Sequence, residues 1–256
     1  MTGGVQPDTG RNVNGLRNAV SLLLESRGVG IDTLHLARRV QSHGVALRTV
    51  LRQAARQADD LLRLQAQADA EVQAAACTGR AVVQAAGTPT RREVLMLDPL
   101  TGADKPVTVA WESALQWRVL TERVRPCGYW LDSGQQAAVA GLQALGVQVQ
   151  RLVAPARQQA EAWIETARGE MVRPDVRGVV ADDERTLLRL VVDLRPGPLD
   201  ALPGQFYVPL DQPLANLVIA ALEPDSQNSY LANRLIDRLD GVRRVLVAPA
   251  GGLAPL

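Results

Sequence analysis

Acidic and histidine side chains are the groups in this sequence whose types could support hydrolytic chemistry. Glu25 ends the apolar run at residues 19–24, within the stretch NAVSLLLESRG. A carboxylate at the tip of a buried strand can have its pKa raised into the range useful for proton transfer. Charged residues also end strands simply because the chain leaves the core there. The local pattern allows Glu25 to be a general base or an ordinary strand end, and it favours the second.

The two histidines, His35 and His43, do not form a zinc-binding pattern. They lie eight positions apart in a segment that we predict to be helical, which separates them by roughly 12 Å along the helix axis. Neither begins an H-E-x-x-H or H-x-x-E sequence. We therefore expect no zinc to be bound by this chain alone, and we interpret both histidines as residues of a helix surface.

Other catalytic and binding motifs are not found. The sequence has no G-x-S-x-G elbow and no glycine-rich phosphate loop. Its 28 basic and 27 acidic residues give a net charge of +1, which offers no electrostatic reason to expect nucleic acid or an anionic membrane surface. We interpret the arginine pairs at 38–39, 91–92 and 243–244 as parts of solvated faces.

The two cysteines, Cys77 and Cys127, match no metal or redox spacing. A single disulfide stays open, but we expect two reduced, buried side chains. The first residues, MTGGVQPDTG, show neither the basic nor the apolar region of a signal peptide. No window reaches the ~18 apolar residues of a membrane span. The compartment is left undetermined.

The pattern of residue types predicts an α/β chain, α+β overall. Residues 19–24 form an apolar run typical of a strand covered on both faces. Residues 34–76 lack proline and are rich in helix formers, with Gly44 as the expected break. We also predict helices at 135–145 and after Asp211. Short β-type runs occupy residues 80–87, 93–98, 105–111, 126–131, 147–153, 185–194 and 205–210. Turns are predicted between the first three runs, at GTPTRR and DPLTGADKP. We place a domain boundary between residues 1–77 and 78–256.

Two groups of sequence stretches resemble bacterial zinc carboxypeptidases of the metallocarboxypeptidase family. The stretch TGRNVNGLRNAVSLLLESRGVG, followed by LHLARRVQSH, resembles the end of their catalytic domain. The stretches RPCGYWL and VPLDQPLANL, with LEPDS after them, resemble the accessory C-terminal region of the same subgroup. The resemblance implies that residues 1–77 are the end of an α/β catalytic domain and that residues 78–256 are an accessory domain.

The same resemblance assigns roles to two residues. Glu25 takes the place of the glutamate that acts as general base on the zinc-bound water and passes the proton to the leaving amine. Arg27 matches the Glu-x-Arg pattern after this strand and is a candidate for substrate binding. The implied activity is hydrolysis of peptides at their C-terminal residue, with zinc as cofactor and a peptide as substrate.

This sequence departs from the family pattern at the metal. The family holds zinc with an H-x-x-E pair and a later histidine, all upstream of the glutamate strand, and the residues before Gly15 contain none of these. We expect a C-terminal part of a longer enzyme, whose lone strand is exposed unless a complementary chain, a second copy or the C-terminal half of this chain covers it. The alternatives are a non-catalytic interaction module and an inactive relative.

Overall fold

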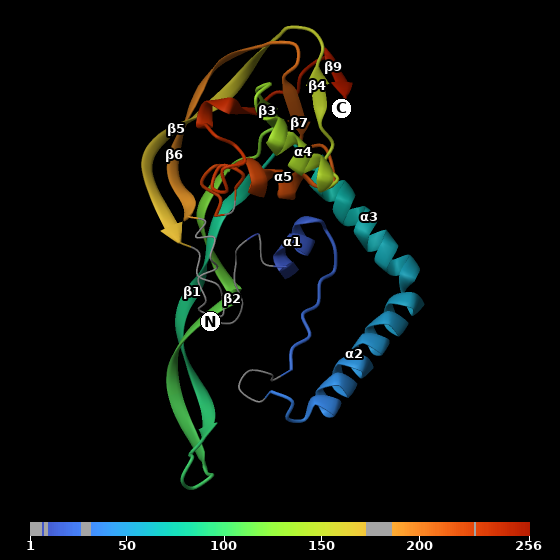
Figure 1. The fold of residues 1–256 in the computed structure, drawn as a ribbon, viewed down its shortest axis with the longest axis vertical. Coiled ribbons are helices and arrows are strands. Elements are labelled where there is room, and N and C mark those ends of the chain that lie inside the picture. The colour runs from blue at the N-terminus through green and yellow to red at the C-terminus, as the bar shows by residue number, and fades with distance from the viewer. Residues whose placement is uncertain (1–6, 8–9, 27–31, 173–185, 228) are drawn as a thin grey trace.

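The structure is a computed structural model that describes residue 7 and residues 10–26, 32–172, 186–227 and 229–256. It consists of helices and antiparallel sheets, which confirms the α+β class. Figure 1 shows a β-rich body, a long hairpin that projects from it, and a helical arm on the opposite side. The helices are α1 (Gly10–Leu16), α2 (Leu36–Arg56), α3 (Ala58–Ala74), α4 (Gln136–Ala144), α5 (Ala215–Leu222) and the 3₁₀ turn η1 (Leu239–Gly241).

The strands fall into two sheets. The hairpin is β1 (Arg80–Leu97) with β2 (Asp104–Val124), and the body is a seven-stranded sheet in the order β6-β5-β8-β3-β7-β4-β9. The remaining strands are β3 (Gly128–Leu131), β4 (Gln150–Leu152), β5 (Ala156–Val172), β6 (Thr186–Ala201), β7 (Phe206–Pro209), β8 (Val242–Val245) and β9 (Leu253–Pro255).

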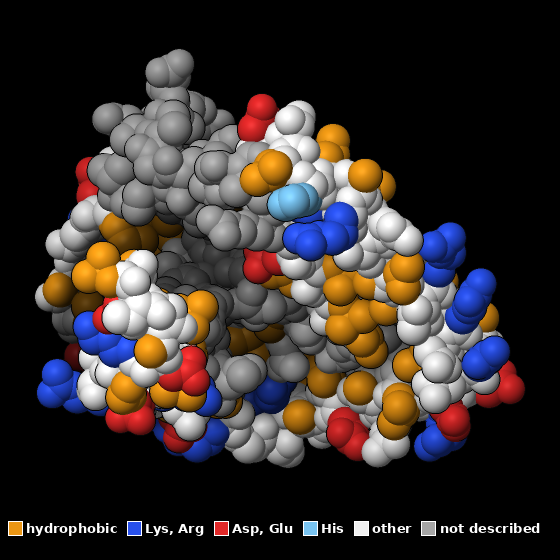
Figure 2. Space-filling view, turned by 90° about the horizontal axis from the view of Figure 1, so that it is seen from below, with side chains coloured by type: hydrophobic (Ala, Val, Ile, Leu, Met, Phe, Trp, Pro, Cys, Tyr) orange, Lys and Arg blue, Asp and Glu red, His pale blue; other side chains and the backbone are white. Residues whose placement is uncertain are grey.

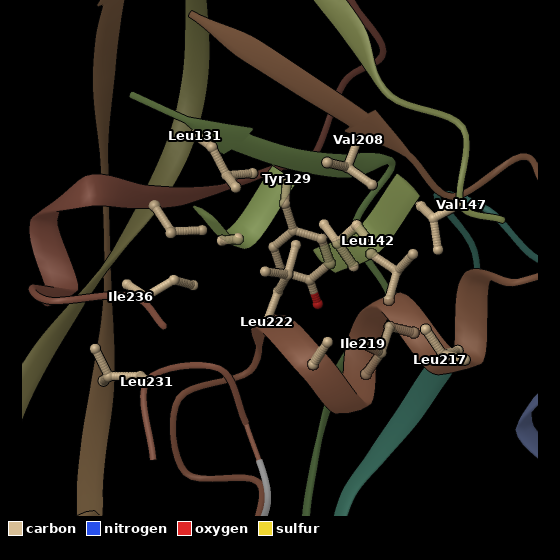
Figure 3. Packing of buried hydrophobic residues seen from close by; sticks show 14 of the residues in the cluster. Tyr129, Leu131, Leu142, Val147, Val208, Leu217, Ile219, Leu222, Leu231 and Ile236 are labelled. Atoms are coloured by element: carbon tan, nitrogen blue, oxygen red, sulfur yellow. The ribbon is translucent and has the colours of Figure 1, made fainter. Parts of the chain in front are cut away.

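The main core lies between the seven-stranded sheet and helices α4 and α5. All four residues of β3 are buried, and Figure 3 shows Tyr129 and Leu131 of this strand facing Leu142 of α4 and Leu222 of α5. Six of the eight residues of α5 are apolar and buried, so this helix is covered on nearly every side. The sequence predicted both helices, because their apolar residues recur at helical spacing.

A second cluster covers the other side of β3 and contains Trp130 and Tyr207. The ring of Tyr207 packs directly on Gly128, where a Cβ atom would lie 2.5 Å from the tyrosine oxygen. Tyr207 donates a hydrogen bond to the carbonyl of Cys127 at 3.1 Å. Gly128 is therefore required at this position, since any side chain would displace the tyrosine.

The hairpin is longer than the sequence predicts. The runs at 80–87 and 93–98 are parts of one strand, β1, although the intervening GTPTRR was predicted to be a turn. Pro89 lacks an N–H donor. It is tolerated in β1 because, among the described residues, this strand pairs on one side only, with β2, and its other edge makes no ladder hydrogen bonds. The predicted turn around residues 98–103 is confirmed, because Asp98 accepts hydrogen bonds from the N–H groups of Leu100 and Thr101.

The helical arm consists of α2 and α3. The long helical segment is confirmed, but it breaks at Gln57 and not at Gly44, which lies within α2. A glycine in an exposed helix costs only about 1 kcal/mol relative to alanine, and no packed neighbour approaches Gly44. Val72 and Ala76, at the end of the arm, pack against the main core. In the part of the chain that the structure describes, no helix has the length and apolarity needed to cross a membrane.

Cys77 and Cys127 form a disulfide, which corrects the expectation of two reduced cysteines. They lie 50 positions apart in sequence, with Cα atoms 4.2 Å apart. The hairpin β1–β2 leaves and re-enters the body at one place, where the N–H of Arg125 donates to the carbonyl of Gly79 at 3.1 Å. The pairing of the two long strands therefore brings the cysteines together, and the sequence spacing carries no sign of it.

Replacing both cysteines, in C77S/C127S, should destabilise the protein by about 4 kcal/mol, the loop-entropy value for closing some 50 residues. Urea unfolding of wild type and variant measures this difference. A thiol reductant should lower the stability of the wild type by a similar amount and leave the double variant unchanged. A loss below about 1 kcal/mol in the double variant would show that other contacts already hold this junction.

Candidate functional site

The segment that leads to Glu25 is fixed at its beginning. Leu16 of α1 packs against the main core, and Arg17 donates from Nη1 to the carbonyl of Leu145 at 2.8 Å. The side-chain amide of Asn18 donates to Asp69 Oδ1 on α3 at 2.8 Å and to the carbonyl of Pro213 at 2.9 Å. These contacts join α1 to both the arm and the body, so the direction in which the next residues leave is determined.

Residues 19–26 run away from this anchor without regular secondary structure. Asn18 turns the chain with a φ of 55°, and Val20 (79% exposed), Leu22, Leu23 and Leu24 then face solvent. The expected buried strand is therefore wrong for this chain by itself. A strand needs a neighbour for its backbone N–H and C=O groups, and no described residue pairs with this segment.

Helix α2 carries a second set of exposed apolar side chains. Four of them recur at helical spacing along one face: Leu36, Val40, Leu47 and Leu51. No residue of α2 is buried. Figure 1 shows α2 as the outer part of the helical arm, and Figure 2 shows hydrophobic side chains over this arm. We call these four residues, together with residues 20–24, the apolar arm surface.

The structure places the expected catalytic residue, Glu25, at the end of residues 20–24. Glu25 is exposed and directly follows Leu24. Arg27 lies outside the described residues. His35 immediately precedes α2 with a φ of 56°, and His43 lies within the helix.

The described residues do not fit the zinc site that the resemblance implies. Among residues 7, 10–26, 32–172, 186–227 and 229–256, no three His, Cys, Asp or Glu side chains come together as a metal site would require. The two histidines belong to one helical segment and do not converge. Glu25 is thus placed without ligands for a metal from the described part of this chain.

A buried ionic cluster inside the body was missed by the sequence analysis. Arg123 donates from both Nη atoms to Asp225, at 2.7 and 2.6 Å, and from Nη1 to Glu223 Oε2 at 3.0 Å. Arg244 donates from Nε to Glu223 Oε1 at 2.9 Å and also pairs with Glu161. We call these five charged residues, with Tyr129, the buried charge cluster.

The interpretation of the arginine pair at 243–244 as solvated is wrong for Arg244, whose side chain is fully buried. Arg244 lies on β8, where neighbouring residues alternate between the two faces of the sheet. The available signal was the position of the arginine pair between Val242 and Val245, within the apolar stretch VRRVLV. The sequence could not show which carboxylates would meet it, since Glu161 and Glu223 come from distant parts of the chain.

Burial and the Glu223 charge raise the pKa of Tyr129 well above its usual value, so this phenol stays protonated. Tyr129 therefore donates to Glu223 Oε1 at 2.7 Å. Burial lowers the pKa of Arg123, but its hydrogen bond to Asp225 and the Glu223 charge more than offset this effect. Glu223 and Arg244 are inaccessible, so these two residues join elements of the body and cannot contact a substrate directly.

A cavity of about 590 Å³ lies between the β1–β2 hairpin and the long antiparallel pair β5–β6. Its walls include Gln84 and Leu120 of β1–β2, Leu188 and Arg189 of β6, and Asp225. The volume falls within the range of small-molecule sites. Its described lining has no histidine or cysteine, and Asp225 is already engaged by Arg123.

Comparison with models of protein families, with curated proteins and with solved structures finds no match to this chain. The carboxypeptidase resemblance therefore stays a prediction that rests on the stretches around Glu25 and in the C-terminal half. Any assignment of function has to be supported by the contacts and exposures described above.

Replacing Glu223 with glutamine should destabilise the body by about 3 kcal/mol, the lower end of the range for breaking a buried ion pair. Glutamine has the same shape, but its amide turns an N–H donor toward arginine or tyrosine donors. Chemical denaturation gives the free energy of unfolding. The matched control is Asp60→Asn, which removes the exposed pair with Arg63 and should change stability by less than about 0.5 kcal/mol. Equal effects of the two substitutions would contradict a structural role for the cluster.

Proposed function

We propose that these 256 residues are the C-terminal part of a hydrolase of the zinc carboxypeptidase class. In the complete enzyme, residues 19–26 would join a β-sheet that residues outside this sequence provide. The observation that carries the proposal is the exposed apolar segment that ends at Glu25. It is anchored at Asn18 and extends into solvent.

The exposed segment has the properties of a strand that lacks its neighbours. Burying a side chain such as Val20 or Leu22 is worth about 1.5–3 kcal/mol, and pairing would satisfy the backbone groups of the segment. The apolar face of α2 supports the same partner. A helix that follows a strand in an α/β domain packs on a face of the sheet which that strand joins.

In such a sheet Glu25 would stand just beyond the end of a strand, where functional groups of α/β domains gather. A carboxylate there can accept a proton from the attacking water and return it to the leaving amine. The zinc ligands would have to come from the same outside residues as the sheet, since the described part of this chain does not supply them. The disulfide agrees with an exported enzyme, because such bonds persist in oxidising compartments.

A non-catalytic interaction module is the second candidate. The body has its own core, its own disulfide and the buried charge cluster, so it does not need a catalytic domain in order to fold. The apolar arm surface would then bind a partner without chemistry at Glu25. A related candidate is an inactive relative of the carboxypeptidases, in which the carboxypeptidase-like residues 1–77 only hold the C-terminal domain.

Replacing Glu25 with glutamine in the complete gene product should lower release of C-terminal residues from peptides by at least about 100-fold. Zinc content and the unfolding temperature should stay at wild-type values, because an exposed carboxylate is exchanged for an amide of the same size. Glu71→Gln on α3 is the control and should keep full activity, since Glu71 is exposed and accepts a hydrogen bond from its helix neighbour Gln67. Full activity of the Glu25 variant would remove this residue from the mechanism.

The 256 residues expressed alone should neither retain an equivalent of zinc nor release C-terminal residues from peptides. Metal analysis after dialysis and a chromatographic peptide assay measure both. One bound zinc together with hydrolysis would contradict the proposal that outside residues complete the site. A complete reading frame without an H-x-x-E motif and a later histidine would favour the interaction module.

A further inference from the structure

The tip of the β1–β2 hairpin is a second exposed apolar surface, separate from the apolar arm surface. Four large apolar residues are strongly exposed there: Leu95, Met96, Leu97 (70%) and Leu100 (94%). Figure 1 shows this end of the hairpin projecting away from the body. We call residues 94–100 the hairpin tip.

Apolar side chains lie on both faces of the tip and at its turn. Successive residues of a strand point to opposite faces, so Leu95 and Leu97 share one face and Val94 and Met96 share the other. Leu95 pairs with Pro106 and Val94 pairs with Val107, which extends each apolar face onto β2, whereas Met96 and Leu97 pair with Lys105 and Asp104. A flat protein surface would cover one face and leave the other in water. A medium that surrounds the tip would cover both.

In the part of the chain that the structure describes, the outer hairpin is held only by contacts between its own two strands and their turn. A two-stranded ribbon is at best marginally stable by itself, and the described part of the chain adds no third strand to β1 or β2. Exposed leucines at its end make this worse, because each keeps apolar surface in contact with water. An apolar surrounding would remove this cost.

Behind the tip the hairpin changes to the residue types of a membrane interface. The guanidinium of Arg92 lies over the ring of Trp111 at 5.1 Å, and tryptophan and long basic side chains are favoured where apolar and polar media meet. Charges in residues 91–105 balance, with three basic side chains (Arg91, Arg92, Lys105) and three acidic ones (Glu93, Asp98, Asp104). Attraction to anionic headgroups is therefore not the driving force.

The turn also limits how deep the tip can go. Asp98 is held by two backbone N–H groups and by Lys105 at 3.6 Å, so its charge is partly satisfied within the hairpin. From residue 94 to residue 97 the strand advances by about 10 Å. This matches the ~5–10 Å depth at which apolar faces lie in the boundary between headgroups and acyl chains.

We propose that the hairpin tip inserts into the surface of a lipid bilayer as an apolar wedge, with Arg92 and Trp111 at the level of the headgroups. The occupant of this surface is the lipid interface, and burial of Leu95, Leu97 and Leu100 provides the attraction. The proposal concerns residues that do not take part in the carboxypeptidase assignment, so the two can fail separately.

Co-sedimentation with vesicles of phosphatidylcholine, which carry no net charge, tests the proposal. The wild-type chain should bind, and the variant L95T/L97T/L100S should lose at least about tenfold in affinity. Threonine and serine keep the strand and the turn compatible with the hairpin, and unchanged thermal unfolding verifies this. The matched control V40Q/L47Q/L51Q removes the same number of exposed apolar residues from α2 and should bind vesicles like the wild type.

A polarity-sensitive fluorophore attached at Leu100→Cys should shift its emission to the blue on adding vesicles, and one at Arg63→Cys on α3 should not. Failure of the wild type to bind, equal losses in both triple variants, or binding only to anionic vesicles at low salt would overturn the proposal. A dimer in solution that the tip substitutions dissociate, without any vesicle binding, would identify a second copy of the chain as the occupant instead.

Discussion

The buried charge cluster is the interaction on which the rest of the structure depends. Its members come from strands β2, β3, β5 and β8 and from the loop after α5: Arg123, Tyr129, Glu161, Arg244, Glu223 and Asp225. Four of the five charges are buried and Glu161 is partly exposed, so each buried charge is tolerated only while its partners stay in place. The cluster therefore holds the root of the hairpin, the centre of the sheet and the end of α5 in one arrangement. Burial of ordinary apolar residues would leave their relative positions less strictly defined.

Two extensions leave this fixed body, and both present apolar residues to solvent. The disulfide and the hydrogen bonds of Asn18 anchor the helical arm and the segment before Glu25, and the cluster anchors the hairpin through Arg123. The anchored ends contact the body, and the outer ends are exposed. The two exposed surfaces differ in shape, because the arm offers one face of a helix beside an extended segment, whereas the hairpin tip has apolar side chains on both of its faces. This difference is the reason for proposing a sheet as the partner of one and a bilayer as the partner of the other.

The position of Glu25 also shows how much of the candidate site can be predicted. Its place at the end of an apolar run is visible in the sequence, and so is the resemblance that suggests a general base. Its surroundings are not, because a strand exists only with hydrogen-bonded neighbours, and the described residues provide none. A carboxylate in water and a carboxylate at the edge of a sheet have different chemistry, so the function of Glu25 depends on residues that would complete that sheet.

Local patterns by themselves determined the elements whose stability comes from near neighbours in sequence. Helices α2 to α5 and the turn at Asp98 follow from helical spacing, helix-forming residues and turn chemistry. Only the tertiary structure decided that Cys77 meets Cys127 and that Arg244 is buried against Glu223. It also decided that residues 80–97 form one strand and that residues 19–24 form none. The physical reason is the same in each case: the stabilising partner lies far away in sequence or outside it, and spacing along the chain carries no record of that partner.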